Sequence, residues 1–437
     1  MSLAPPIDVQ KFINSHKLSA VQIITLLLCF FIVAVDGFDT AAIGFIAPAI
    51  RAEWSLSPAQ LAPVFGAGLA GLMAGAFLFG PLADRFGRKT ILLVCVAFFG
   101  AASLVSAYST SLDMLIVLRF LTGLGLGGAM PNSVTLSSEY APEKHRSVLV
   151  TTMFCGFTLG SALGGVADYG WRAVLVIGGV LPLALVPLLW LVLPESVRYL
   201  VMKGIQPEQV RHTLQRIAPD EDLSQASFCV PEKAQTGFPV KHLFDPALRR
   251  GTLLLWLTFF MSLLVIYLLS SWLPTLIKST GRSLKDASLV TAMFQIGGTV
   301  GAIGLGQLMD RFNPQRVLGL AYLLAAFFVA LIGSSTASTP LLVLAVFGAG
   351  ICISGAQVGA NALSAGFYPT ASRATGVSWA SGIGRIGSVL GSMAGGWMLA
   401  LGWSLPVVFA AVGVPALVAA FGITLMGRAS PVVSAAH

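Results

Sequence analysis

"GPLADRFGRK" (residues 80–89) and "GQLMDRFNPQR" (residues 306–316) share the pattern G-x-L-x-D-R-F at an offset of 226 residues. A second pattern, P-x-x-x-R, occurs at residues 142–146 and again at residues 369–373, at an offset of 227. Glycines at positions 160 and 164 recur at positions 387 and 391, also at an offset of 227. Three matches at nearly one offset indicate that the chain is a duplication of a single unit.

The composition places both copies in a lipid bilayer. Of the 437 residues, 56% are hydrophobic and 10% are charged, whereas soluble chains have about 25% charged residues. Only one long polar segment, residues 194–250, interrupts the apolar sequence. About 20 apolar residues form a helix that crosses the hydrocarbon core, and the chain contains twelve such runs: 19–43, 60–82, 90–108, 113–137, 148–167, 172–193, 251–275, 287–308, 316–334, 340–363, 374–400 and 405–426.

We therefore predict an all-α membrane protein with twelve transmembrane helices in two pseudo-symmetric six-helix bundles. The predicted bundles are residues 1–193 and 251–437, and residues 194–250 form a cytoplasmic linker with short surface helices. With the N-terminus in the cytoplasm, 19 of the 26 Lys and Arg residues lie on the cytoplasmic side. This asymmetry follows the positive-inside rule and predicts that both termini are cytoplasmic. It also explains the net charge of +8 without a nucleic-acid partner.

Four charged residues lie in the interior of apolar runs, away from the run ends: Asp36, Asp39, Arg119 and Arg385. Each costs about 2.5–3.5 kcal/mol on insertion scales, so we expect them to line a polar cavity. A parallel duplication places such a cavity at the interface between the halves, near mid-membrane. Asp36 and Asp39 are three residues apart and share a helix face. Two neighbouring carboxylates in a low dielectric cannot both ionise cheaply, which suits proton coupling; the structural alternative is a fixed pair with Arg119.

Arg385 is the predicted anchor for an anionic substrate, because a guanidinium binds a carboxylate with two parallel hydrogen bonds. Arg119 either binds substrate or tunes a nearby aspartate. Aromatic side chains would supply apolar walls, and amides would bind a ring hydroxyl. The alternatives are an ion pair for Arg385, packing for the aromatics and helix ties for the amides. The aromatic candidates are Trp379, Phe367, Phe154 and Phe157, and the polar candidates are Gln357, Asn361, Gln295 and Asn132.

A second set of charges is expected to gate the cytoplasmic side. Asp84 lies at the C-terminal end of a helix, where the dipole disfavours a carboxylate. It would be favoured opposite the N-terminus of the helix that begins near Thr375, with Asp310 as its weaker counterpart. Glu139, which we also assign to proton coupling, is expected to pair with Arg146 or Arg373. Arg85 and Arg88 of the basic turn after Asp84 complete the gate, and Arg88 and Lys89 are also expected to be positive-inside surface anchors.

G-x-L-A-D-R-x-G-R-K, "RFLTGLGLGG" (119–128) and "LPESVRYL" (193–200) resemble the major facilitator superfamily over essentially the whole chain. "DGFDTAAIGFIAPAI" (36–50) is similar to the aromatic acid:proton symporter family, and "VQKFINSHKLSAVQ" (9–22) to its hydroxybenzoate and protocatechuate members. The resemblance implies import of an aromatic carboxylate with protons across a bacterial inner membrane, for catabolism, by a monomer. The resemblance also implies functional roles for the charged residues that match charged positions of the family, which are Asp36, Asp39, Asp84, Arg119, Glu139, Arg373 and Arg385.

One departure from relatives is that all five histidines lie outside the apolar runs, so proton transfer must use carboxylates. Other functions fit parts of this sequence, among them a second role as a sensor that binds aromatic acids for chemotaxis. A proton antiporter that exports drugs or organic acids could use the same acids, and "PESVRYL" suggests sugar import. An enzyme is not expected, because no run contains a histidine or a hydrolase motif, although a Ser–Asp or Asp–Asp site stays open. The five cysteines lack metal-ligand spacing, so we expect neither metal nor cofactor.

Overall fold

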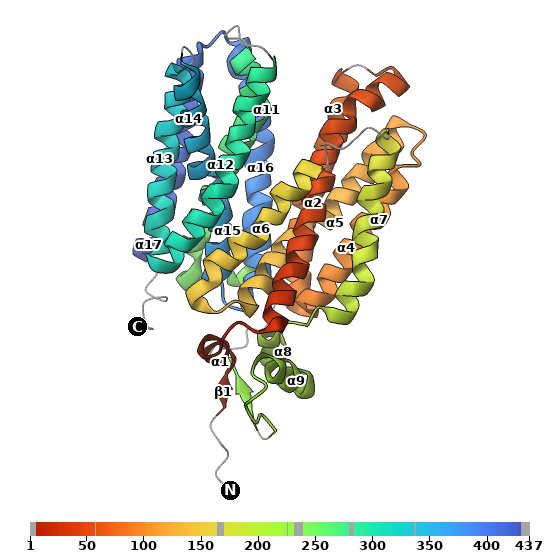
Figure 1. The fold of residues 1–437 in the computed structure, drawn as a ribbon, viewed down its shortest axis with the longest axis vertical. Helices are drawn as coiled ribbons and strands as arrows, with labels where there is room; N and C mark the ends of the chain where they lie inside the picture. The colour runs from red at the N-terminus through yellow and green to blue at the C-terminus, as the bar shows by residue number, and fades with distance from the viewer. Residues whose placement is uncertain are drawn as a thin grey trace. The chain divides into compact units, whose positions relative to one another are not determined.

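The computed structural model describes residues 6–56, 58–163, 170–224, 226–230, 239–278, 284–335 and 338–429. A helix covers each predicted apolar run (Figure 1). In the first half these helices are α2 (Ala20–Trp54), α3 (Pro58–Phe86), α4 (Arg88–Ser106), α5 (Leu112–Tyr140), α6 (Arg146–Leu163) and α7 (Trp171–Val192). In the second half they are α11 (Pro246–Lys278), α12 (Leu284–Arg311), α13 (Pro314–Ser334), α14 (Thr339–Ala349) with α15 (Gly355–Phe367), α16 (Arg373–Ala400) and α17 (Leu405–Ala429).

Within the described residues, nine helical segments are long and apolar enough to cross a membrane. The helices α6, α12 and α16 are not in that set. A multi-pass membrane protein is therefore supported by length and composition, while the full count of twelve spans stays a prediction.

The chain divides into two compact units. Unit 1 comprises Met1–Leu243 and Ala365–Trp379, and unit 2 comprises Phe244–Ser364 and Ala380–His437. The helix α16 thus begins within unit 1 and continues within unit 2. The segment before and at the start of α16 thus packs within unit 1, and the boundaries at 193 and 251 stay a prediction.

The duplication is visible in the way glycines pack within each unit. A methyl group on Gly71 or Gly75 of α3 would strike a carbonyl oxygen of α5, at Phe120 and Leu124 respectively. In unit 2 the corresponding glycines of α12 meet the corresponding carbonyls one repeat later, which are Gly297 with Phe347 and Gly301 with Ile351. Small residues let two backbones approach closely, and here the same contact is built twice.

Glycines of α6 and α16 show the same device against the first helix of their own unit. A side chain at Gly160 would strike the Ala34 carbonyl of α2, and one at Gly391 would strike the Leu264 carbonyl of α11. The packing interpretation of these glycines is therefore confirmed within each unit. Gly164 lies outside the described residues.

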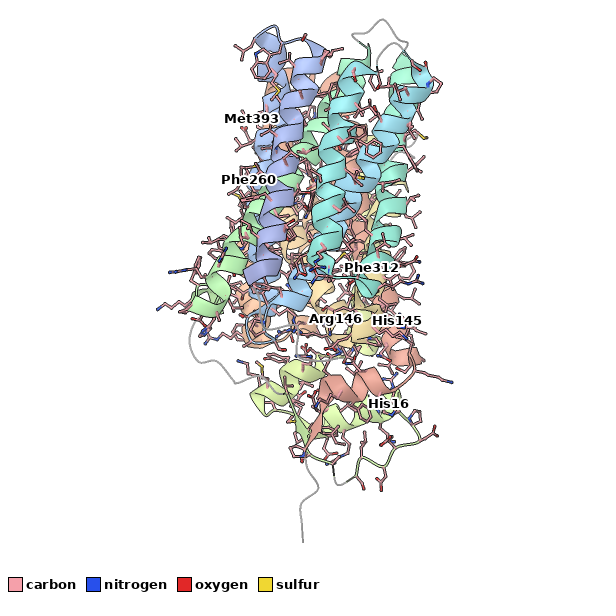
Figure 2. All side chains as sticks on the ribbon, turned by 90° about the vertical axis from the view of Figure 1, so that its left-hand side faces the viewer. His16, His145, Arg146, Phe260, Phe312 and Met393 are labelled. Atoms are coloured by element: carbon pink, nitrogen blue, oxygen red, sulfur yellow. The ribbon has the colours of Figure 1, made fainter. Side chains whose placement is uncertain are left out.

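Polar segments gather at one end of unit 1, where Figure 1 shows α1, α8 and α9 together. The strand β1 (Ile7–Asp8) pairs in parallel with β2 (Phe228–Cys229), and α1 (Val9–Ser15) follows. The predicted short helices of the linker are α8 (Val197–Lys203), α9 (Pro207–Ile217) and α10 (Pro239–His242). The described histidines lie outside the candidate spans, as expected; Figure 2 labels two of them, His16 after α1 and His145 in the 3-10 helix η1 (Glu143–His145).

One helix contains an irregularity that the sequence did not suggest. Between α14 and α15 the chain forms a π-helical segment, Gly350–Ser354, labelled η2. Such insertions are uncommon and occur frequently at functional sites. This one lies directly before the turn of α15 that carries Gln357, one of the predicted polar candidates.

Candidate functional site

Asp39 of α2 is held by two other helices of unit 1. Its carboxylate accepts hydrogen bonds from Nη1 and Nη2 of Arg119 in α5, at 3.3 and 2.8 Å. Ser103 of α4 donates to the same carboxylate at 3.0 Å. The side chains of Arg119 and Asp39 are 5% and 0% exposed. A buried ion pair is tolerated only when its geometry and added hydrogen bonds offset desolvation, and this pair has both.

Asp36 lies one turn earlier on α2 and is also buried. Its Oδ1 accepts a hydrogen bond from the Thr40 hydroxyl at 3.2 Å. Of the two predicted acids, Asp39 is thus the one that receives the Arg119 fork. The structural alternative, an acid paired with Arg119, describes Asp39.

Arg385 of α16 is half-buried in unit 2 and meets Tyr267 of α11. Nη1 of Arg385 donates a hydrogen bond to the Tyr267 hydroxyl oxygen, and the guanidinium carbon lies 5.8 Å from the centre of the Tyr267 ring. Within the part of the chain that the structure describes, Arg385 forms no ion pair. The predicted alternative, a salt bridge between helices, is therefore not found there.

The sequence of unit 2 explains why Arg385 lacks a carboxylate partner inside its own unit. Unit 2 contains only three acidic residues, and each lies at a helix end: Asp245 before α11, Asp286 at the start of α12 and Asp310 at its end. Arg385 is therefore a cation deep in an apolar helix with no acid at its own level. Such a charge is costly in a membrane unless an anion compensates it.

The predicted substrate residues of α15 are buried. Gln357 and Asn361 are 6% and 8% exposed, and the Asn361 amide donates to the backbone oxygen of Gln357 at 3.1 Å. The side-chain oxygen of Gln357 is buried and has no hydrogen-bond partner among the described residues. An unsatisfied buried acceptor costs about 1–3 kcal/mol, so a ligand hydroxyl would stabilise it.

The predicted aromatic residues of unit 1 make packing contacts. Trp379 stacks edge-on against Phe77 of α3, with ring centres 4.9 Å apart. Phe157 of α6 is half-buried, and its carbonyl lies against Gly37 of α2. These contacts agree with the packing alternative and leave a role in binding a prediction.

Asp84 meets the N-terminus of α16, as its position predicted. Oδ2 of Asp84 accepts hydrogen bonds from the backbone amide and the hydroxyl of Thr375, both at 2.8 Å, and Oδ1 accepts one from the Ala374 amide at 3.3 Å. The free N–H groups and positive dipole of a helix N-terminus favour such a carboxylate. Asp84 therefore caps the start of α16 inside unit 1.

Glu139 and two arginines adjoin this cap. Oε1 of Glu139 lies 3.2 Å from Nη1 of Arg373 and 3.5 Å from Nη2 of Arg88. Nη2 of Arg88 is also 2.7 Å from Asp84 and donates to the Thr370 carbonyl at 2.7 Å. Of the two predicted partners of Glu139, Arg373 is the observed one.

Arg88 was also predicted to be a surface anchor, and that interpretation is wrong. Its side chain is completely buried between Asp84 and Glu139. Only Gly87 separates α3 from α4, which begins at Arg88. The Arg88 guanidinium reaches back across this turn to Asp84 in the last turns of α3. The surface cations of this turn are Arg85, which is exposed and stacks on Phe86, and Lys89, which is half-exposed.

The remaining gate candidates lie apart from this network. Arg146 forms an ion pair with Glu143 of η1 at 3.7 Å. Asp310 lies half-exposed in the last turn of α12. The structure thus brings together Asp84, Arg88, Glu139 and Arg373, whereas Arg146 has a neighbouring partner of its own.

Glu195, which belongs to the "LPESVRYL" motif and was not a predicted site residue, caps α4. Its Oε1 accepts hydrogen bonds from the backbone amides of Arg88 and Lys89 at 2.9 and 3.1 Å. Burial raises the pKa of the Glu195 carboxyl, and the backbone amides and Arg88 oppose that rise. Sequence reasoning also missed Ser103 and Tyr267; the available signal was a polar residue within an otherwise apolar run.

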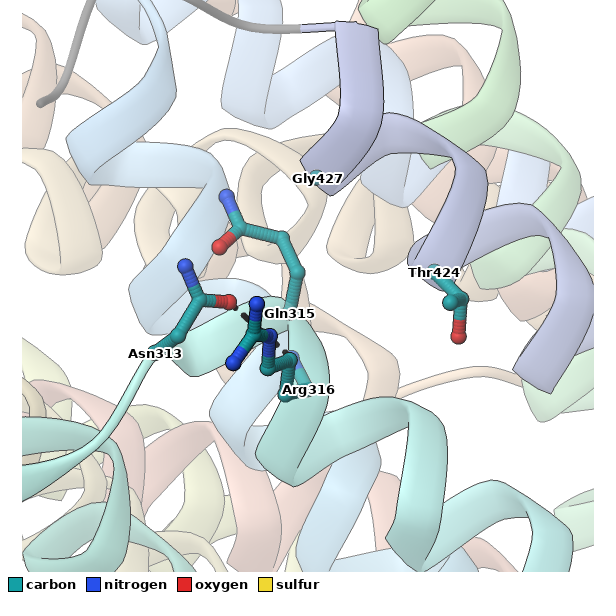
Figure 3. Close-up of a pocket in the computed structure, with 5 residues that line it drawn as sticks. All are labelled: Asn313, Gln315, Arg316, Thr424 and Gly427. Atoms are coloured by element: carbon teal, nitrogen blue, oxygen red, sulfur yellow. Dashed lines mark hydrogen bonds between the residues drawn. The ribbon is translucent and has the colours of Figure 1, made fainter.

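One small cavity lies elsewhere in unit 2. It has a volume of about 210 Å³ and lies between the start of α13 and the end of α17 (Figure 3). Its lining contains none of the predicted site residues and consists of Asn313, Gln315, Arg316, Thr424 and Gly427.

Comparison with known proteins agrees with this architecture. The profile of the Major Facilitator Superfamily matches residues 29–283 and 255–436. The chain is 50% identical to the 4-hydroxybenzoate transporter PcaK of Pseudomonas putida, over 98% of each chain. It is 47% identical to the gallate transporter of Pseudomonas putida, again over 98% of each.

Among solved structures, a proton:xylose symporter of the same superfamily matches with a TM-score of 0.71, over 95% of each chain at 18% identity. That likeness concerns the fold alone. The similarity to the two Pseudomonas proteins, by contrast, extends over 98% of each chain at 50% and 47% identity. The chain therefore belongs to the major facilitator superfamily and, within it, to the family of aromatic acid transporters, which are not enzymes.

Proposed function

We propose that this chain imports an aromatic carboxylate of the hydroxybenzoate class together with protons, by alternating access. The observation that carries the proposal is the uncompensated Arg385 of unit 2. A permanent cation in an apolar helix, with most of its donors unused, is suited to an organic anion. The relatives' names, 4-hydroxybenzoate and gallate transporters, point to aromatic acids.

Proton coupling rests on the two acids of α2. Asp39 already has a cation and a hydroxyl donor as partners. Asp36 is buried beside it, and the Arg119 fork is directed to Asp39. We assign the transported proton to Asp36, and we assign to Asp39 the role of keeping Arg119 and α2 in register. Neutralisation of Asp36 by a proton would remove the cost of a second buried negative charge.

The network around Asp84 is the proposed gate. Asp84 and Glu139 hold the start of α16 through the Thr375 amide and Arg373. Release of these bonds would free the first turns of α16 from unit 1 during the transport cycle. Glu139 is completely buried and touches two arginines, so a proton on it would weaken both contacts.

The setting of this activity follows from the charge distribution and from the relatives. We place the protein in a bacterial inner membrane as a monomer of twelve spans with both termini cytoplasmic. Relatives that are 46–50% identical to this chain come from the bacterial genera Pseudomonas and Acinetobacter.

The test is uptake of labelled 4-hydroxybenzoate by purified protein in proteoliposomes. We expect accumulation above equilibrium when the outside is acidic, and only equilibration when no gradient is imposed. Asp36→Asn should still exchange substrate across the membrane and should lose accumulation. Equal accumulation without any gradient would overturn proton coupling. Efflux driven by external acid would instead support the antiporter.

A further inference from the structure

Tyr267 occupies an unusual place for a tyrosine in an apolar helix. It is the one tyrosine within the run 251–275, and its hydroxyl oxygen accepts a hydrogen bond from Nη1 of Arg385. No other hydrogen bond of this hydroxyl occurs among the described residues. Its oxygen is therefore engaged, whereas its proton is still available to donate.

Two threonine hydroxyls of unit 2 are satisfied in a different manner. Thr258 of α11 and Thr424 of α17 donate to backbone carbonyls of their own helix, at Leu254 and Ala420. A phenol cannot reach back in this way, because its hydroxyl stands far from its own backbone. The Tyr267 proton thus needs an acceptor that comes from outside the helix.

A guanidinium donor changes the chemistry of that phenol. When a cation donates to the hydroxyl oxygen, it polarises the O–H bond and makes the proton a stronger donor. Arg385 keeps the N–H groups that do not face Tyr267. Arg385 and Tyr267 therefore present hydrogen-bond donors from two directions. A carboxylate matches them, because it has two oxygens that only accept hydrogen bonds.

We propose that Tyr267 is a substrate-binding residue that forms a carboxylate clamp with Arg385. Arg385 donates to one carboxylate oxygen of the substrate, and the Tyr267 hydroxyl donates to the other. This inference rests on the proposed function and adds the residue that selects a carboxylate over a neutral group. An amide or ester in that position would offer one acceptor instead of two and would lack the charge.

The test measures equilibrium binding of 4-hydroxybenzoate to the full-length protein in nanodiscs, with no gradient, by calorimetry. Tyr267→Phe keeps the ring and removes the donor, and we expect about 10-fold weaker binding, as for one charge-assisted hydrogen bond. The matched control is Tyr322→Phe, which removes the hydroxyl of another buried tyrosine of unit 2 and should leave the affinity unchanged.

A second variant separates a donor to substrate from a mere tether for Arg385. Replacement of Tyr267 by 3-fluorotyrosine acidifies the hydroxyl, which makes it a better donor and a poorer acceptor. A clamp predicts tighter binding of 4-hydroxybenzoate below the fluorophenol pKa, and a tether predicts weaker binding. This variant keeps the side-chain shape, so it decides the matter even if Tyr267→Phe misfolds.

The outcomes are distinguishable from failure of the proposed function. If the unmodified protein binds 4-hydroxybenzoate and Tyr267→Phe binds it equally well, the clamp is overturned while the substrate class stands. Weaker binding by the fluorotyrosine variant also overturns the clamp. If the unmodified protein binds neither 4-hydroxybenzoate nor gallate, the proposed substrate class fails and the clamp fails with it.

Discussion

Units 1 and 2 repeat the same packing contacts but differ in how their charged residues are paired. The same glycines of α3 and α12 lie against the same carbonyls one repeat later. Yet Arg119 of unit 1 has a carboxylate in its own unit, whereas the half-buried Arg385 of unit 2 meets only a phenol. Duplication thus preserved the backbone contacts, and the polar residues diverged.

This difference separates two uses of a buried arginine. In unit 1 the ion pair is complete without a ligand, so it stabilises the contact between α2 and α5. In unit 2, under the function proposed above, the cation of Arg385 receives the anionic substrate. A duplicated transporter can thus hold its shape with one copy and bind its substrate with the other.

The largest expected effect is on the complete pair. Asp39→Asn leaves Arg119 buried without its counter-ion, which should lower the free energy of unfolding by about 3–5 kcal/mol. Denaturant unfolding in detergent measures it. The double variant Asp39→Asn/Arg119→Gln should recover part of the loss, and Asp113→Asn, at an exposed acid of α5, should have no effect. A stable single variant would mean that the pair contributes no net stability.

The second prediction converts unit 2 to the electrostatics of unit 1. Tyr267→Glu should give Arg385 an internal carboxylate, so that affinity for 4-hydroxybenzoate falls by about 100-fold, which corresponds to about 2.7 kcal/mol. The melting temperature should not fall, because the charge is now paired. Tyr267→Gln is the neutral control and should bind better than the glutamate variant. Unchanged affinity in Tyr267→Glu would show that Arg385 is not the anion site.

The third prediction compares the two copies of the D-R-F turn. Asp84→Asn weakens three hydrogen bonds to the start of α16 and should cost about 1.5–3 kcal/mol. Asp310→Asn, at the half-exposed counterpart in unit 2, should cost less. Thermal unfolding of both variants measures the difference. Equal losses would remove the argument that only the first copy is a gate.

Packing should respond alike in both units. Gly160→Ala and Gly391→Ala each push a methyl group into a backbone carbonyl of the facing helix, and overpacking of this kind costs about 1–3 kcal/mol. Gly304→Ala is the control, because a methyl group there meets nothing within 4 Å. The yield of monodisperse protein and its melting temperature report the effect. A loss confined to one unit would contradict the duplicated packing.

The smallest effect concerns Glu195 of unit 1, since the sequence of unit 2 has no acidic residue after Asp310. Because burial raises the pKa of this carboxyl, the folded protein binds its proton at a pH where the unfolded chain has lost it. The resulting contribution to stability is present below the ordinary glutamate pKa of 4.5 and is lost as the pH rises through the raised value. Melting temperatures measured from pH 4.5 upward should show this fall in the native protein, and Glu195→Gln should flatten it.

Several features could be read from residue order because they depend on neighbours in the chain. Hydropathy runs of about 20 residues predict the long helices, and the dipole argument predicts that Asp84 lies opposite the start of α16. The motif offsets of 226 and 227 anticipated the repeated glycine contacts. Each of these inferences needs only local sequence or a comparison of two stretches.

The choice of partner for each buried charge depended on folding. Residue order could not say which of Asp36 and Asp39 meets Arg119, 80 residues from Asp39, because one helical turn decides which side chain faces α5. Residue order indicated a surface anchor at Arg88, although the fold buries that guanidinium between Asp84 and Glu139. Tyr267 was not singled out, since only the packing of α11 against α16 brings its hydroxyl to Arg385. The sequence by itself determined that charges would be buried, because hydropathy is a property of neighbours along the chain; tertiary structure decided how they pair, because Coulombic and hydrogen-bond energies depend on distances between helices.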